Sequence, residues 1–144
     1  MYLDDVQLNA QIDLPPVVLS KDEIVEFARK YDPLPMHYDE EYAKTTHFGG
    51  LFSPGILSML KVWAQFVEMQ VFGEGMIAGK SAKIEWIKPV FPEDTLSGRI
   101  TFTNVTRRNP YNGIVEILME VFNQNGDLVL THLTESVVKY RNGS

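Results

Sequence analysis

The stretch "GILSMLKVWAQFVEMQVF" (Gly55–Phe72) decides the fold that this sequence predicts. Its polar positions as far as Glu68 fall on one narrow stripe of a helix, and nearly all other positions are apolar. The stripe consists of Ser58, Lys61, Gln65 and Glu68. A helix that is apolar over most of its circumference is a core element. We expect Ser53 as its N-cap and Pro54 as its first residue, because proline suits the first helical position.

Downstream of this helix the pattern changes to the alternation of β-strands. The strand-like segments are "SAKIEWIKPV" (81–90), "DTLSGRITFTNV" (94–105), "GIVEILMEVF" (113–122) and "LVLTHLTESVV" (128–138). The third segment is nearly all apolar, which predicts a strand covered on both faces. Asn125-Gly126 predicts a hairpin before the last segment. We expect four meandering antiparallel strands wrapped around one long helix, an α+β fold.

Two shorter helices are expected before the long one. Ser20 and Glu23 form a capping-box pattern, and an amphipathic stripe follows until Pro33 ends the helix. Asp39 is a suitable N-cap for a short helix that ends near Thr45. We find no repeat or linker, so the 144 residues are expected to form a single domain over 1–144, with its core within about 17–140.

Composition excludes several classes of function. The net charge is −6 and the sequence has no basic run, which argues against a nucleic-acid partner. The longest apolar stretch carries charges, which argues against a membrane span. Without cysteine, and with His residues that lack metal-ligand spacing, we expect no metal site. The acidic N-terminus does not resemble a signal peptide, so we expect a cytoplasmic protein.

A candidate catalytic pair lies in "YDPLPMH" (31–37), where Asp32 and His37 are separated by two prolines. A carboxylate and an imidazole can activate water and return its proton. A proline-rich turn between two short helices could hold the two side chains in a fixed relation. The alternative is an ordinary turn, since Asp before Pro is a common turn former. The spacing alone does not decide between these interpretations.

The segment "FGGLFSPG" (48–55) precedes the long helix and offers backbone donors. Glycines allow a ligand to approach the backbone closely, and a helix N-terminus presents unpaired N–H groups with a positive dipole. Such donors can hold a developing enolate oxygen, as an oxyanion hole does. The alternative is that these glycines only end the short helix and admit the long one.

Taken together, these motifs resemble a known family. "YDPLPMH", "DEEYAKTTHFGGLFSPG", the long apolar helix, "IEWIKPVFPEDTL" and "NQNGDLV" follow one another in the order found in MaoC-like dehydratases, also called hydratase 2. The resemblance spans about residues 17–140. It implies a hot-dog fold, in which an antiparallel sheet wraps around a long central helix. It also implies homodimers or higher homo-oligomers formed through sheet edges.

The resemblance implies a hydro-lyase of fatty acid metabolism. Such enzymes reversibly add water to a trans-2-enoyl thioester of coenzyme A, usually giving the (R)-3-hydroxyacyl thioester, with no cofactor besides the coenzyme A of the substrate. The family's catalytic Asp and His fall on Asp32 and His37, and the glycine whose N–H polarises the thioester carbonyl falls on Gly55. The expected substrate-binding residues are Leu34, Phe48, Gly49, Gly50, Ser53 and Trp63.

Three positions depart from the family pattern. Leu34 stands where many members have an Asn that supports the site, and its side chain cannot hydrogen-bond. Pro54 replaces a common His or Ser before the glycine and lacks an N–H. Trp63 stands where some members have a Ser, and its indole is expected to shorten the acyl tunnel.

Two other functions stay open. A hot-dog acyl-CoA thioesterase usually needs a carboxylate on the long helix, where Glu68 lies more than three turns from Gly55. A non-catalytic acyl-CoA-binding protein is favoured by Leu34 and Pro54. The sequence does not define the acyl group, the stereochemistry, the direction of the reaction, or the choice between coenzyme A and acyl carrier protein. Candidate phosphate contacts, or ordinary surface cations, are Lys83, Lys88, Arg107 and Arg108.

Overall fold

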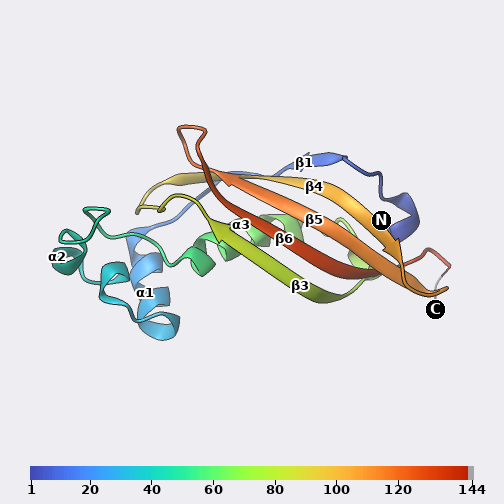
Figure 1. The fold of residues 1–144 in the computed structure, drawn as a ribbon, viewed down its shortest axis with the longest axis horizontal. Coiled ribbons are helices and arrows are strands. Elements are labelled where there is room, and N and C mark those ends of the chain that lie inside the picture. Colours follow the sequence, from blue (N-terminus) through green and yellow to red (C-terminus); the bar gives the residue numbers. More distant parts are fainter. Residues whose placement is uncertain (143–144) are drawn as a thin grey trace.

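The computed structural model describes residues 1–142 and consists of one sheet with helices packed on one face and at one end (Figure 1). The strands are β1 (Gln11–Asp13), β2 (Val17–Val18), β3 (Met76–Trp86), β4 (Thr95–Arg107), β5 (Asn112–Phe122) and β6 (Leu128–Lys139). The α-helices are α1 (Lys21–Tyr31), α2 (Glu40–Ala43) and α3 (Gly55–Glu68). Short 3₁₀-helices are η1 (Leu3–Asp5), η2 (Pro35–His37) and η3 (Gly73–Gly75).

The sheet is antiparallel throughout, with the strand order β1-β4-β5-β6-β3 and with β2 also paired to β4. The expected meander is correct for β4, β5 and β6. It is wrong for β3, which pairs with β6 and not with β4. The segment after Trp86 leads the chain from β3 past β6 and β5 to β4, so these two consecutive strands are not neighbours in the sheet. Strand β3 is therefore an edge strand of the sheet.

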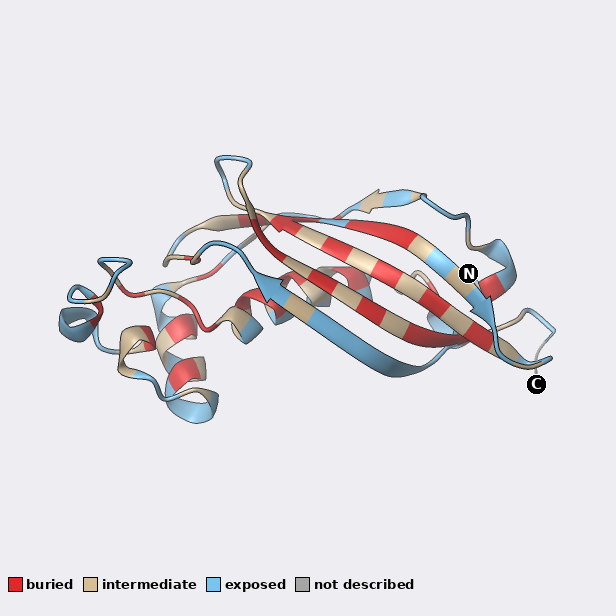
Figure 2. Cartoon of the chain, in the orientation of Figure 1, coloured by how far each residue is buried: buried red, intermediate tan, exposed pale blue. Residues whose placement is uncertain are grey.

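Helix α3 packs on the inner face of the sheet (Figure 1), which confirms the predicted α+β, hot-dog arrangement. Val62 and Phe66 of the helix belong to one buried cluster with Ile100, Phe102 and Met119 of the sheet. Strand β5 alternates strictly between buried and half-buried residues, as the banding in Figure 2 shows. The expectation that this strand is covered on both faces is wrong, because the residues on its outer face are only half-buried and no helix or strand within residues 1–142 lies over them.

The two helices before α3 lie together beyond one end of the sheet (Figure 1). Helix α1 begins with the predicted capping box of Ser20 and Glu23, and the Asp39 side chain caps α2 by accepting from the Tyr42 N–H. Lys61 of α3 lies 2.6 Å from Glu23 and holds the pKa of that carboxyl below its usual value through a hydrogen bond. This ion pair ties α1, whose end carries Asp32, to the central helix.

The central helix differs from expectation at its start and on its surface. Pro54 is the N-cap and Gly55 the first helical residue, because the Ser53 hydroxyl donates to the Pro54 carbonyl and does not cap the helix. Ser58, expected on a solvated polar stripe, is fully buried. The exposed side of the helix carries Ile56, Leu60 and Val67. In residues 1–142 no helix is long and apolar enough to cross a membrane.

Candidate active site

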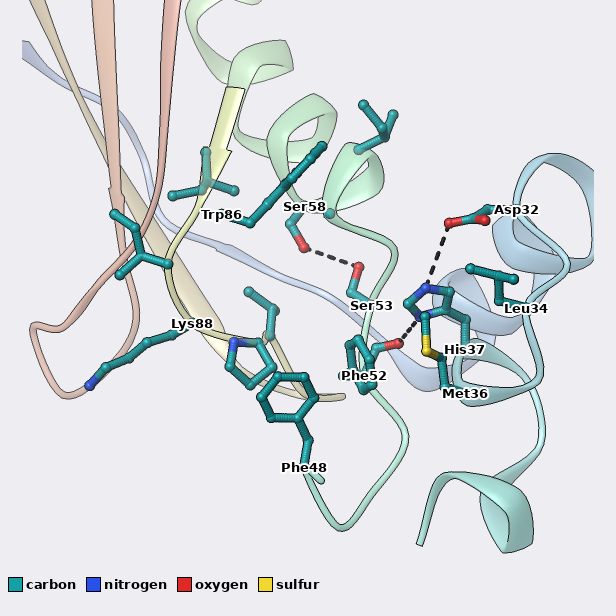
Figure 3. A pocket seen from close by; sticks show the side chains of 16 residues that line it. Asp32, Leu34, Met36, His37, Phe48, Phe52, Ser53, Ser58, Trp86 and Lys88 are labelled. Atoms are coloured by element: carbon teal, nitrogen blue, oxygen red, sulfur yellow. Dashed lines mark hydrogen bonds and ion pairs between the residues drawn. The ribbon is translucent and has the colours of Figure 1, made fainter. Parts of the chain in front are cut away.

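A cavity of about 380 Å³ opens at the N-terminus of α3, where the helix meets η2 and the end of β3 (Figure 3). Its polar side chains come from Asp32, His37, Ser53, Ser58 and Lys88. The remaining wall is almost wholly apolar. The apolar lining residues are Leu34, Met36, Phe48, Phe52, Ile56, Trp86, Ile87, Pro89, Val90 and Leu130, with Gly55 at the start of the helix. Such a cavity suits an apolar ligand held by a few polar groups.

His37 ends the 3₁₀-helix η2, which begins at Pro35, and its side chain is almost completely buried. Its Nδ1 lies 2.7 Å from the carbonyl oxygen of Phe52. A carbonyl can only accept, so Nδ1 carries the proton and donates it. The other ring nitrogen, Nε2, faces the Asp32 carboxylate at 3.6 Å (Figure 3). The backbone of the segment before α3 therefore determines which face of the imidazole is presented to Asp32.

Asp32 is the C-cap of α1, and its N–H donates to the Ala28 carbonyl. Its side chain is 40% exposed and points toward the imidazole. A separation of 3.6 Å is too long for a direct hydrogen bond. One water molecule can instead donate one O–H to the carboxylate and the other to Nε2, which leaves its oxygen lone pair free to attack. The pair is thus arranged to orient and deprotonate water.

The N-terminus of α3 faces the same cavity. The first intrahelical bond runs from the Ser58 N–H to the Pro54 carbonyl, so the N–H groups of residues 55–57 have no partner within the helix. Gly55 is needed here for a reason that the sequence did not suggest. A Cβ atom at this position would lie 2.1 Å from Nε1 of Trp86, so the indole packs directly against the glycine.

The structure brings together six of the nine predicted site residues: Asp32, Leu34, His37, Phe48, Ser53 and Gly55 all line the cavity. It does not bring Gly49, Gly50 or Trp63 there. Gly49 has φ +72°, a conformation that favours glycine, and open space surrounds both glycines, so they serve the turn that leads to α3.

Trp63 lines a second cavity of about 520 Å³ at the other end of α3, with Phe66, Phe72 and Met76. Its position two turns beyond Gly55 places it away from the first cavity, so the expected shortening of the acyl site by Trp63 finds no support in this geometry. The indole packs edge-on against His132, with ring centroids 5.0 Å apart. His132 is buried on the inner face of β6, its Nδ1 has no hydrogen-bond partner in the described chain, and burial lowers its pKa.

Sequence reasoning missed the residues that close the cavity from the sheet side. Trp86 and Ile87 stand at the end of β3, and Leu130 pairs with Trp86 across the strands. A signal was present: the alternation of "KIEWIK" fails at Trp86-Ile87, where two large apolar residues are adjacent. Successive side chains of a strand point to opposite faces of the sheet, so two adjacent large apolar residues do not fit the alternation. They indicate that the strand ends here and that the two side chains have different surroundings.

The four cations considered as phosphate contacts do not share one site. Lys88 lines the cavity and pairs with Asp127 at 3.2 Å. Lys83 pairs with Glu85 on β3, and Arg107 lies over the Tyr140 ring near the opposite end of the sheet. Among these four residues, only Lys88 borders the cavity.

Comparison with known proteins identifies the family and agrees with the fold. The sequence profile of the MaoC-like domain matches residues 5–121, which is more than half of the chain. The chain belongs to the MaoC-like domain family. A family relative, the uncharacterized protein YdeM of Bacillus subtilis, is 32% identical over 128 residues, covering 86% of this chain and 89% of the relative.

Solved structures show the same fold. The MaoC-like dehydratase from Rhodospirillum rubrum is 28% identical, with a TM-score of 0.91 and 98% of each chain covered. The (R)-hydratase from A. caviae involved in PHA biosynthesis superposes with a TM-score of 0.75 at 24% identity, covering 94% of this chain and 97% of that one. Family membership therefore supports a hydratase or dehydratase in general terms.

Proposed function

We propose that the protein reversibly hydrates a trans-2-enoyl thioester of coenzyme A to a 3-hydroxyacyl thioester. The observation that carries this proposal is that one cavity is bordered both by the Asp32–His37 pair and by the open N-terminus of α3. Hydration of an enoyl thioester needs these two features, because water must be deprotonated at one end of the conjugated system while charge develops on the carbonyl oxygen at the other.

The reaction follows from the geometry. Water held between Asp32 and Nε2 of His37 attacks C3 of the enoyl group, and Nε2 accepts its proton as the C–O bond forms. The electron pair of the double bond moves to C2 and the carbonyl, and the resulting enolate oxygen is held by the Gly55 N–H and the helix dipole. The proton then passes to C2, so that OH and H have been added across the double bond. Dehydration is the reverse sequence.

The apolar part of the wall accounts for the acyl group. Met36, Phe48, Trp86 and Ile87 surround the cavity near its opening, and the buried Leu130 closes it from the sheet. Lys88 borders the cavity and its side chain is half-exposed, so its ammonium group can meet a phosphate of coenzyme A. We propose coenzyme A as the carrier on this basis.

The thioesterase alternative is less well supported. The part of α3 that lines the cavity contributes Gly55, Ile56 and Ser58, and Glu68 is the last residue of the helix, at its far end. A carboxylate on α3 is therefore not in reach of a thioester bound at Gly55.

We further propose that two copies of the chain pair through β3. This strand has one unpaired edge over eleven residues, and exposed apolar side chains lie on it and beside it on α3. They include Ile77, Trp86, Ile87, Leu60 and Val67. An unpaired edge that carries such side chains is a template for another strand. Antiparallel pairing about a two-fold axis would bury them in both copies.

The test of the reaction is the loss of conjugated-enoyl absorbance when purified protein is mixed with enoyl-CoA substrates of increasing chain length. We expect turnover with at least one of them. Asp32→Asn and His37→Ala should each lower kcat by at least about 100-fold, because each removes a proton-transfer group. Matched controls are Asp39→Asn in the cap of α2 and His47→Ala, neither of which lines the cavity.

Release of free thiol from a saturated acyl-CoA would favour a thioesterase. Binding of acyl-CoA without turnover of any enoyl-CoA would favour a non-catalytic binding protein. Full activity in both Asp32→Asn and His37→Ala would refute the assignment of the catalytic pair, while equal losses in the control variants would show that the effect is not specific to it.

A further inference from the structure

We propose that Ser53 and Ser58 are positioning residues, which fix the orientation of the Pro54–Gly55 peptide and thereby aim the Gly55 N–H. The two hydroxyls form a chain at the start of α3: Ser58 Oγ donates to Ser53 Oγ at 3.0 Å, and Ser53 Oγ donates to the Pro54 carbonyl at 2.9 Å. This inference rests on the proposed hydration, because that reaction gives the Gly55 N–H its task.

The planarity of the peptide bond couples the Pro54 carbonyl to the Gly55 N–H. The Pro54 carbonyl and the Gly55 N–H belong to one trans peptide unit and point in opposite directions. Holding the carbonyl oxygen therefore sets the direction of the N–H. The Pro54 oxygen accepts two hydrogen bonds, one from the Ser58 N–H at 3.2 Å and one from the Ser53 hydroxyl. Two donors from different directions restrict rotation of this peptide more than the single helical bond would.

The hydroxyl chain is built as a support and not as a surface feature. Ser53 and Ser58 are only 4% and 1% exposed, yet both border the cavity. In a buried site each hydrogen bond polarises the next, so the donation from Ser58 strengthens the bond from Ser53 to the Pro54 oxygen. Figure 3 shows the Ser53–Ser58 bond beside the cavity, on the α3 side.

The same short segment is anchored on both sides of Ser53. The Ser53 N–H donates to the Val90 carbonyl at 2.7 Å. The carbonyl of the preceding residue, Phe52, accepts a hydrogen bond from the His37 imidazole. The segment 52–55 thus carries the oxyanion donor and also holds the imidazole of His37 through the Phe52 carbonyl. A rotation of the Pro54–Gly55 peptide would move the donor relative to His37 without disturbing either outer anchor, and the serine chain opposes this rotation.

The test measures the infrared stretching frequency of the thioester carbonyl that the Gly55 N–H is proposed to contact. Butyryl-CoA with a ¹³C-labelled thioester carbonyl cannot be hydrated, and its carbonyl stretch falls in frequency when the oxygen accepts a hydrogen bond. We expect a lowered band with the native protein and a band closer to that of free butyryl-CoA with Ser53→Ala and with Ser58→Ala. With enoyl-CoA, these variants should lose about 10-fold in kcat with KM changed less than about threefold, since a misaligned donor weakens transition-state binding most.

Two further variants separate positioning from packing. Ser136→Ala removes an equally buried serine in β6 that does not line the cavity, and it should leave the band and kcat unchanged. Ser53→Thr keeps the hydroxyl and should retain most of the native band shift. Thermal unfolding of each variant checks that it is folded, and Ser53→Ala and Ser58→Ala test the same chain independently.

The outcomes are distinct. A native shift that is unchanged in both Ser53→Ala and Ser58→Ala would overturn the positioning role and leave the proposed reaction intact. An unshifted band in a native protein that hydrates enoyl-CoA would overturn the positioning role and leave the proposed reaction intact, and an unshifted band together with no turnover of any enoyl-CoA would overturn both proposals. A native shift that both alanine variants diminish, in a protein that hydrates no enoyl-CoA, would overturn the proposed reaction and support the positioning role.

Discussion

His37 and Phe52 are joined by a 2.7 Å hydrogen bond from the imidazole Nδ1 to the backbone carbonyl, across fifteen residues of sequence. This bond connects η2 to the segment that leads into α3. It also determines that Nε2, and not Nδ1, faces Asp32. The backbone thus selects the tautomer of the neutral imidazole before any substrate is bound.

The first prediction concerns this tautomer. In ¹⁵N NMR spectra of the native protein above neutral pH, the Nδ1 of His37 should carry the proton, and Nε2 should give the signal of an unprotonated nitrogen. His37→Ala identifies the signals by their disappearance. A neutral His37 with its proton on Nε2 would contradict the arrangement and would remove the proposed acceptor of the water proton.

The second prediction concerns the contact between Gly55 and Trp86. Gly55→Ala should lower kcat/KM by about 100-fold, because the new Cβ displaces the indole from the cavity wall and disturbs the helix N-terminus. Steady-state kinetics with enoyl-CoA measure the effect. In a Trp86→Ala background the same substitution should cost much less, which a double-mutant cycle would show. Additive losses would mean that the indole is not the cause.

The third prediction concerns Leu34, which is about half-exposed and lines the cavity beside Asp32. In Leu34→Asn an amide replaces the apolar side chain and can donate to the Asp32 carboxylate. We expect a several-fold higher kcat with a short enoyl-CoA and a stability change within about 0.5 kcal/mol, as is usual for surface positions. Leu34→Ala is the control. A higher KM in both variants without a gain in kcat would assign Leu34 to acyl binding alone.

The fourth prediction concerns His132, whose ordinary pKa near 6.5 is lowered by burial. Above that value the side chain is neutral in both the folded and the unfolded protein and contributes no pH dependence. As the pH falls below 6.5, the unfolded chain binds the proton first, so the free energy of unfolding decreases until the lowered folded pKa is reached. Urea unfolding at pH 8 and pH 5 measures this loss, which should be smaller in His132→Met. An equal loss in both proteins would place its origin elsewhere.

The fifth prediction concerns the edge strand. We expect a dimer for the native protein and a monomer for Ile77→Lys in light scattering after size-exclusion chromatography, because the lysine would have to be buried between the paired strands of the proposed dimer. Leu8→Lys is the matched control: Leu8 is 54% exposed, Ile77 is 51% exposed, and Leu8 lies outside the helices and strands. A native protein that is monomeric at micromolar concentration would refute the proposed assembly.

Local signals in the sequence predicted local structure well. The capping box of Ser20 and Glu23, the Asp39 cap and the turn around Asn125-Gly126 all occur where nearest neighbours determine the conformation. The pairing of β3 with β6 could not be predicted in this way, because alternation shows which side chains share a face and not which strand lies beside it. Periodicity indicated a sheet wrapped around one long helix, and the resemblance to a family identified this arrangement as a hot-dog fold.

For the site, residue types made Asp32 and His37 candidates, and the resemblance to a family implied roles for both of them and for Gly55, but neither described their surroundings. Ser58 is polar, so helix periodicity places it on the exposed side of α3. Its burial depends on a hydrogen-bond partner, Ser53, that lies before the helix and that periodicity does not take into account. Trp86 reaches the site only because the end of β3 returns to the start of α3, a contact between segments thirty residues apart. Tertiary contacts of this kind decide the walls of a cavity.

The proposed proton-transfer groups and the oxyanion donor lie within residues 32–55, whereas much of the apolar wall comes from residues 86–90 and Leu130. The two stretches meet only where the chain folds back on itself. Natural variation in the second stretch can therefore reshape the space for the acyl group while the reacting atoms keep their relation to one another. In this scaffold, substrate range and reaction type can evolve on different segments of one short chain.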